Sequence, residues 1–379
     1  MNLHPLGPVI VIVLVAILLI AISIRRLRTL RHAPLGKARR ITERVLLCFA
    51  IFICAFLACT TIYNAAALRY YRAIYPPPGK IYQVNGYDMH LYCTGEGSPT
   101  LVLEAGGGNS SLTWTKVQPE LSKITRVCSY DRAGFGWSTP QPPPRDANTI
   151  ARDLHALLQE AGVQGPIVLM AHSRGGLYVR AYQHFYPEQV RGLILLDVAT
   201  PLDDDQLSPQ LRAAHSYSKP FRELLLAIVT LGLHRVTGSC SPDPRFDQAT
   251  GTRYAQLECG KLPTPIFQEY LTTELSGQET VHTGPYGDMP ILVFSRDPEL
   301  QKQQSGLPPP LALEDTTVWN RLQEELKQLS TRSRRIIAKG SGHPIQMERP
   351  ELVNREVATF IQQLRTNEPR TDYGSTTTE

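Results

Sequence analysis

Two kinds of apolar segment divide this sequence. Leu6–Ile24 and Val45–Leu68 are long stretches without a charged residue, whereas short apolar runs alternate with amphipathic stretches beyond residue 80. Each long stretch has about the length needed to cross a hydrocarbon core of about 30 Å as a helix. We therefore expect residues 1–72 to form a membrane hairpin with spans at about 6–24 and 45–68, so that the lipid bilayer is the partner of residues 6–68.

The charges beside these segments predict their orientation. Positive residues are concentrated between Arg25 and Arg44, in the connection between the two stretches. Short basic loops stay on the cytoplasmic side, so the domain after the hairpin should lie on the periplasmic or extracellular side. A cleaved signal peptide is the alternative for the first stretch. It is disfavoured because the positive charge follows the apolar run and no small-residue cleavage motif is present.

Beyond a Pro/Gly linker at residues 73–80, the pattern predicts strands that alternate with helices. Asn85-Gly86 separates two short runs and predicts a hairpin, because both residues tolerate positive φ. Apolar positions from Ile150 to Ala161 fall on one face of a helix, with Asn148 placed to cap it. Such alternation predicts an α/β fold with a mostly parallel, eight-stranded sheet covered on both faces. The expected strands are 81–84, 87–93, 100–104, 126–130, 166–171, 192–197, 290–295 and 335–338.

The alternation is interrupted once. Residues 199–288 are expected to form a lid or cap insertion between the two parts of the core, 81–198 and 289–365. Within the insertion, Pro220–Val236 predicts a helix with a broad apolar surface, suited to lining a pocket, touching lipid or packing on the domain. The polar residues 366–379 are expected to be a disordered tail.

Composition narrows the possible partners. The net charge of +5 comes from the region beside the apolar stretches, so nucleic-acid binding is not expected. Cys240 and Cys259 could pair in an oxidising compartment, which the sequence leaves open. Cys93 and Cys128 are expected to be small, unpaired residues of buried strands. No Cys/His spacing resembles a zinc site, and no metal or organic cofactor is expected.

The segment PIVLMAHSRGG at Pro166–Gly176 predicts a nucleophile. A strand that meets a helix through a strained turn exposes the serine at the turn, and the positions two before and two after must be small. Here Ser173 is flanked in this way by Ala171 and Gly175. An alcohol needs a base to activate it, unlike the aspartate of dehalogenases and epoxide hydrolases, and those reactions are therefore not expected.

His343 is the expected base, because it lies late in the chain in a glycine-rich loop after a strand. Asp297, which follows the strand 290–295, is the expected acid. Asp197 is the alternative acid, since it ends the earlier strand. His172 is expected to pack away from the nucleophile.

The run LVLEAGGGNSS at Leu101–Ser111 predicts the oxyanion hole. Glycines after a strand allow backbone N–H groups to approach a ligand closely, although a simple turn would also explain them. We expect the backbone amides of Gly107 and Arg174 to be the two donors.

Four motifs in this order resemble the α/β-hydrolase superfamily and, within it, the proline-iminopeptidase-like branch. They are LVLEAGGGNSSLTW, SYDRAGFGWS, AHSRGG and SGHPIQMERPELV. The resemblance covers residues 80–365 and implies the α/β-hydrolase fold; the hairpin is not part of the family's common core. It also implies that Asp131 and Arg132 shape a turn behind the site.

Three functions follow as expectations. The first is a membrane-anchored serine hydrolase that cleaves a carboxylic ester, or an amide, of a small and apolar substrate through an acyl-enzyme. The second is a proline-iminopeptidase-like aminopeptidase, in which Asp203-Asp204-Asp205 could bind the substrate amine. The third is a non-catalytic, membrane-tethered binding module, because fold alone does not establish activity.

Overall fold

The computed structural model describes residues 7–201, 203–259, 264–366 and 371–379. The chain folds into two compact units. The helical unit comprises Met1–Pro76, Lys219–Asp243 and Thr252–Pro263, and the sheet unit comprises Pro77–Ser218, Pro244–Gly251 and Thr264–Glu379. The expected insertion 199–288 is therefore divided between the two units.

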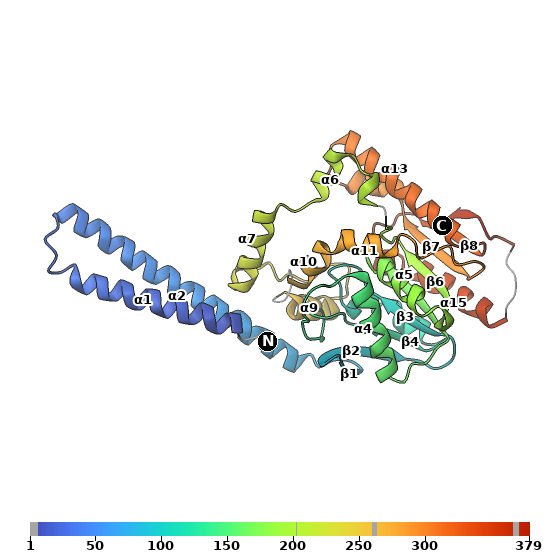
Figure 1. Cartoon of the computed structure of the whole chain (residues 1–379), viewed down its shortest axis with the longest axis horizontal. Coiled ribbons are helices and arrows are strands. Elements are labelled where there is room, and N and C mark those ends of the chain that lie inside the picture. Colours follow the sequence, from blue (N-terminus) through green and yellow to red (C-terminus); the bar gives the residue numbers. More distant parts are fainter. Residues whose placement is uncertain (1–6, 202, 260–263, 367–370) are drawn as a thin grey trace. The chain divides into compact units, whose positions relative to one another are not determined.

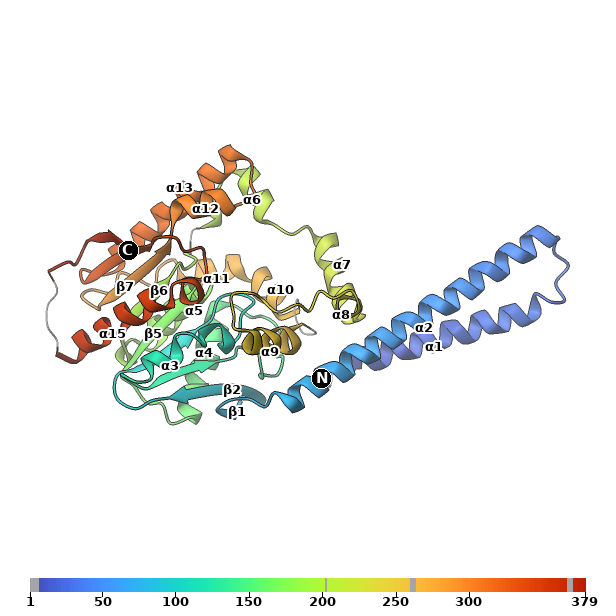
Figure 2. The same cartoon turned by 180° about the vertical axis from the view of Figure 1, so that it is seen from behind.

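Helices α1 (Gly7–Thr29) and α2 (Lys37–Ile74) form an antiparallel hairpin in the helical unit, and they lie side by side in Figures 1 and 2. Both helices are long and apolar enough to cross a membrane, and only 11% of either apolar window is buried within the protein. The second helix does not end with the apolar stretch at residue 68. It continues without a break to Ile74.

The remainder of the helical unit comes from the insertion. It contains α7 (Lys219–Thr230), α8 (Leu233–Val236) and the end of α9 (Gln248–Glu258). The helix expected over residues 220–236 is divided because Gly232 has a left-handed φ of 72°. A disulfide joins Cys240 to Cys259, which answers the question that the sequence left open.

The sheet unit contains a nine-stranded sheet of order β1-β2-β4-β3-β5-β6-β7-β8-β9. Pairing is antiparallel for β1 with β2 and for β2 with β4, and parallel for the remaining neighbours. Asn85 and Gly86 make the expected hairpin turn with φ values of 52° and 83°. The mostly parallel sheet confirms the predicted fold class. The strands are β1 (Lys80–Val84), β2 (Tyr87–Thr94), β3 (Thr100–Glu104), β4 (Val127–Tyr130), β5 (Ile167–His172), β6 (Val190–Leu196), β7 (Ile291–Arg296), β8 (Ser333–Ala338) and β9 (Thr376–Thr378).

The ninth strand corrects the prediction of a disordered tail. Thr376–Thr378 pairs in parallel with β8, so disorder is the wrong prediction for these residues. Three consecutive β-branched residues suit a strand, and the edge of β8 supplies the partner. Residues 367–370 of the predicted tail lie outside the described residues.

Helices cover both faces of the sheet (Figures 1 and 2). Val102 of β3 packs into an apolar cluster with α4 (Ala147–Glu160) and α5 (Gly175–Phe185). Its neighbours Leu101 and Leu103 pack into a second cluster with α15 (Pro350–Thr366). This alternation is the two-residue period of a buried strand. The other helices are α3 (Gln118–Leu121), α6 (Pro209–His215), α10 (Thr264–Leu271), α11 (Thr273–Thr280), α12 (Pro298–Gln304), α13 (Pro309–Glu325) and α14 (Ile345–Glu348).

Two local predictions need correction. The cap of α4 is Asp146, whose carboxylate accepts from the amide of Thr149 at 2.8 Å, and not Asn148. Cys93 and Cys128 are not separate core residues. They face each other across the antiparallel pair β2–β4 and form a disulfide, because that register brings their Cα atoms to 4.0 Å.

Candidate active site

Ser173 stands at a strained turn between β5 and α5. Its φ is 54°, which is uncommon for a residue with a side chain. A Cβ at Gly175 would lie 2.8 Å from the Glu104 side chain, and one at Gly176 would lie 2.5 Å from Val198. The small residues after Ser173 therefore let the start of α5 pack tightly against the sheet, which is the geometry of a nucleophile elbow.

A chain of hydrogen bonds begins at this serine. His343 Nε2 lies 2.8 Å from Ser173 Oγ, and His343 Nδ1 lies 2.6 Å from Asp197 Oδ2. Asp197 follows β6, and His343 lies in the loop after β8. The carboxylate is fully buried, whereas 35% of the His343 side chain is exposed. A hydroxyl, an imidazole and a buried carboxylate thus lie in line, and Ser173 at the end of this line is only partly buried.

The structure does not bring Asp297 to the imidazole. Its Oδ1 accepts from the amide of Glu299 and its Oδ2 from that of Gly340, each at 2.9 Å. Asp297 is therefore the N-cap of α12 and also holds the loop after β8. The expectation that Asp297 contacts His343 is wrong, and the alternative, Asp197, occupies that position. Both Asp297 oxygens are instead occupied by the backbone amides of Glu299 and Gly340.

Asp197 has two further partners that sequence reasoning missed. Trp319 Nε1 donates to its Oδ1 at 2.8 Å, and the Arg296 guanidinium forms an ion pair with its Oδ2. Burial by itself would raise the pKa of Asp197, but Arg296 and the bonds from His343 and Trp319 hold that pKa well below its usual range. Arg296 is the last residue of the buried strand β7, a position where functional residues often lie, whereas nothing in the sequence indicated Trp319.

His172 does more than fill space. Its ring is buried, and Nε2 donates to the backbone oxygen of His343 at 3.0 Å. Burial, with the nearby His343, lowers the pKa of His172 to about 3. It therefore stays neutral at physiological pH and supports the loop that carries His343.

The glycine loop after β3 lies against the elbow. A Cβ at Gly106 would lie 2.6 Å from His172 Nδ1 and 3.1 Å from Ser173 Cβ. A Cβ at Gly107 would lie 3.1 Å from Arg174 Nη1. The structure thus brings Gly107 and Arg174 together beside Ser173, while their role as oxyanion donors stays a prediction.

Arg132 holds this loop from behind. Its Nη1 donates to Ala105 O at 2.7 Å and its Nη2 to Gly106 O at 2.9 Å. The same buried guanidinium pairs with Glu104 and with Glu269 of α10. Burial raises the pKa of Glu104 to about 7, although Arg132 opposes this shift. The loop is thereby tied to a helix of the insertion.

Asp131 organises the turn beside Arg132. Its oxygens accept from the amides of Ser111 at 2.7 Å and Trp137 at 2.9 Å, and from His90 Nδ1 at 2.8 Å. Burial would raise the pKa of this carboxyl, but these donors lower it to about 2. Asp131 and Arg132 thus occupy the structural positions that the resemblance implied.

The described residues contain one cluster of metal-ligand type, in the helical unit. His234, Cys240 and Cys259 place their ligand atoms within 4.8 Å of one another. Both sulfur atoms belong to the disulfide, which leaves no thiolate for a metal.

The fold and the elbow together define a class, a serine-bearing α/β-hydrolase fold. The family described as alpha/beta hydrolase fold matches residues 99–222, which include the glycine loop and the elbow. The chain has the α/β-hydrolase fold, and the part of it that holds the elbow matches the family model. The comparisons do not distinguish a proline-iminopeptidase-like branch.

One curated relative that is matched over most of its length has a name of the same kind. An AB hydrolase superfamily protein of Gibberella zeae is 26% identical over 293 residues, which cover 70% of this chain and 87% of that protein. Two others are matched only in part, since the chain spans 16% of a Hormonema carpetanum protein at 37% identity and 44% of YbdG of Bacillus subtilis at 28%.

Solved structures agree in fold but differ in chemistry. A thermophilic esterase from Thermogutta terrifontis is 21% identical with a TM-score of 0.54, covering 75% of this chain and 98% of the esterase. The epoxide hydrolase CorEH is 18% identical with a TM-score of 0.52, covering 76% of this chain and 99% of that protein. At these identities the similarity establishes the fold alone.

Proposed function

We propose that this protein is a membrane-anchored serine hydrolase that cleaves a carboxylic ester. The observation that carries the proposal is the continuous chain from Ser173 Oγ through His343 to the buried Asp197, with contacts of 2.8 and 2.6 Å. Nucleophile, base and orienting acid in hydrogen-bond contact are the requirement for activating an alcohol.

In this mechanism His343 Nε2 takes the proton of Ser173 as Oγ attacks the ester carbonyl. Asp197 accepts the hydrogen bond from Nδ1, which keeps the imidazole in the correct tautomer and stabilises the imidazolium. The negative charge on the carbonyl oxygen is held by the amides of Gly107 and Arg174. His343 then protonates the leaving alcohol, and water releases the acid from the acyl-enzyme by the same steps.

An aminopeptidase is the enzymatic alternative. It would need carboxylates that can receive the substrate's N-terminal amine. The carboxylate of Asp203 accepts from the amide of Thr200 at 2.9 Å and so holds its own loop. We therefore expect faster cleavage of p-nitrophenyl esters than of aminoacyl p-nitroanilides, and the opposite preference would favour the aminopeptidase.

Several features support the membrane anchoring and the side of the membrane on which the hydrolase part lies. The helices α1 and α2 are long and apolar, and the basic connection between them favours the cytoplasm. The disulfides Cys93–Cys128 and Cys240–Cys259 suit an oxidising compartment, which lies on the other side. We infer that the hydrolase part lies on the periplasmic or extracellular side.

Fluorophosphonate labelling of the full chain in membranes tests the proposed chemistry. We expect the wild type to be labelled, and labelling to disappear in Ser173→Ala and in His343→Ala, because the probe reacts with a base-activated serine. Thermal unfolding of each variant shows whether it is folded. A folded wild type that resists labelling would contradict the mechanism and favour a non-catalytic binding module.

A further inference from the structure

The helices of the insertion pack on the last turns of α2. The buried residues of α2 lie in that region and include Thr60, Thr61 and Asn64. Thr60 Oγ1 donates to Leu231 O at 2.7 Å, and Asn64 Nδ2 donates to Val229 O at 3.4 Å. The carbonyls at the end of a helix have no partner within it, so side chains of α2 cap the end of α7.

The approach of the two backbones is close. A Cβ at Gly232 would lie 2.3 Å from the carbonyl oxygen of Thr60. A side chain at residue 232 would therefore collide with α2, and the left-handed φ there also favours glycine. The contact is built into the local backbone and does not depend on flexible side chains alone.

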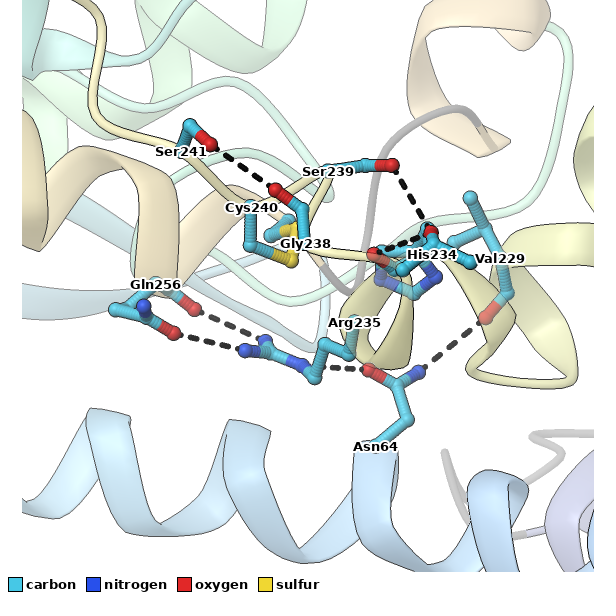
Figure 3. The surroundings of a disulfide bond; sticks show 11 residues. Asn64, Val229, His234, Arg235, Gly238, Ser239, Cys240, Ser241 and Gln256 are labelled. Atoms are coloured by element: carbon cyan, nitrogen blue, oxygen red, sulfur yellow. Dashed lines mark hydrogen bonds between the residues drawn. A yellow bond between two sulfur atoms is a disulfide. The ribbon is translucent and has the colours of Figure 1, made fainter.

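Arg235 and a disulfide complete this contact (Figure 3). The Arg235 Nε donates to Asn64 Oδ1 at 2.8 Å, and its Nη1 donates to Gln256 Oε1 at 2.9 Å. Cys240–Cys259 links the chain after α8 to the chain after α9. We name Asn64, Arg235, Gln256 and this disulfide the clasp, because together they hold two parts of the insertion to α2.

The clasp lies where the residues of α2 change from apolar to polar. The stretch before it is apolar and uncharged, whereas Thr60, Thr61 and Asn64 are polar. Tyrosines follow at residues 63, 70, 71 and 75, and such residues favour the membrane–water interface. With 38 residues, α2 is about 57 Å long, nearly twice a hydrocarbon core of about 30 Å. When the apolar part crosses, the clasp stands at the outer interface.

The helix held by the clasp has an apolar surface that the protein does not cover. None of the residues of α7 is buried. The side chains of Leu224 and Phe221, one turn apart, are 56% and 45% exposed, and Val236 of α8 is 49% exposed. Lys219, Arg222 and Glu223 supply charge on the same short helix. Apolar residues on one face and cations beside them are typical of a helix that lies in a membrane interface.

We propose that α7 is an interfacial helix whose partner is the lipid bilayer. The clasp fixes α7 to the part of α2 that leaves the hydrocarbon core, and Leu224 enters the boundary between headgroups and acyl chains. This inference rests on the proposed anchoring of α1 and α2. It assigns to one helix of the insertion a membrane contact in addition to the two spans.

Tryptophan quenching by brominated acyl chains tests the proposal. The full chain would be placed in vesicles of phosphatidylcholine and phosphatidylglycerol, and the fluorescence of each variant compared with that of the wild type. Leu224→Trp should add emission of which on the order of half or more is quenched, because the indole reaches the acyl chains. The matched control Glu223→Trp, on the adjacent charged position, should add emission that the lipid barely quenches.

A third position distinguishes failure of the interfacial helix from failure of the proposed anchoring of α1 and α2. Leu46 of α2 is 61% exposed, and Leu46→Trp reports whether the hairpin is inserted. Quenching at residue 46 without quenching at residue 224 would overturn the interfacial helix and leave the anchoring intact. Absence of quenching at residue 46 would overturn both. Fluorophosphonate labelling of the same samples reports the proposed chemistry independently.

The clasp is tested by Arg235→Ala, combined with Leu224→Trp and, in a second protein, with Leu46→Trp. Loss of the Asn64 and Gln256 contacts should weaken the attachment of α7, so quenching at residue 224 should fall at least twofold while quenching at residue 46 is kept. Quenching at residue 46 reports the insertion of the hairpin itself, so a misfolded anchor would be recognised by a loss of quenching at that position. Unchanged quenching at residue 224 would show that the clasp does not hold α7.

Discussion

At the scale of single residues, the proposed chemistry depends on which carboxylate meets the imidazole. Asp197 and Asp297 each follow a parallel strand of the sheet, and of these two only Asp197 contacts His343. Asp197→Asn should lower kcat by about 10³- to 10⁴-fold, because the imidazole then loses the carboxylate that orients and stabilises it. Steady-state ester hydrolysis by the folded variant measures this effect.

Asp297→Asn is the control for that prediction. An asparagine oxygen can still cap α12, so we expect kcat to change by less than about tenfold. A larger loss of activity from Asp297→Asn than from Asp197→Asn would show that the carboxylate roles are reversed.

Arg296 gives the site an unusual charge balance. The guanidinium pairs with the carboxylate oxygen of Asp197 that also contacts His343, and so competes for its negative charge. In Arg296→Met the buried Asp197 carboxylate loses its ion pair, so the free energy of unfolding at neutral pH should fall by about 3–5 kcal/mol. The difference between variant and wild type should shrink as the pH falls, because Arg296 lowers the pKa of Asp197 and the wild type loses this ion pair when the carboxylate is protonated. Urea unfolding at several pH values measures both effects.

Trp319→Phe provides the matched control for this loss of stability. It removes one hydrogen bond to Asp197 and no charge, so the free energy of unfolding should fall by a smaller amount, about 1–3 kcal/mol. Equal losses in the two variants, or no loss in Arg296→Met, would show that the ion pair of Arg296 does not stabilise Asp197.

At the scale of elements, the loop after β3 is held by a buried ion network. Arg132 joins this loop to α10 through Glu104 and Glu269, and all three side chains are buried. Arg132→Met should lower the free energy of unfolding by about 3–5 kcal/mol, since two carboxylates lose a buried partner. Urea unfolding of the detergent-solubilised protein measures this difference.

The exposed pair Arg321–Glu325 offers a comparison within the same unit. Its side chains are 47% and 45% exposed, so Arg321→Met should change stability by less than about 1 kcal/mol. Equal effects of the two substitutions would contradict a special role for the Arg132 network.

At the scale of the whole molecule, the proposed topology places the loop between α1 and α2 opposite the hydrolase part. In sealed cells, a cysteine introduced at Lys123, whose side chain is 67% exposed, should react with a membrane-impermeant maleimide, and one at Leu35 should react only after lysis. The physical reason is the retention of short basic loops in the cytoplasm. Reaction at Leu35 in intact cells would reverse the orientation.

Features with a local physical cause could be predicted from the sequence alone. The strand limits follow from short apolar runs, the elbow at Ser173 from the small residues that a strained turn requires, and the apolar hairpin from the length of its uncharged stretches. His343 was predictable because a loop after a late strand is where this fold places its base. These signals need no knowledge of which elements are neighbours.

Other features depend on neighbours distant in sequence, and only the tertiary structure decided them. Asp197 contacts His343 because the turn after β6 and the loop after β8 meet at the same edge of the sheet, and Cys93 meets Cys128 because of the register between β2 and β4. The partners of Asp197 and the packing of the insertion on α2 arise in the same way. A linear pattern specifies which side chains an element presents, whereas strand order and helix packing specify what those side chains meet.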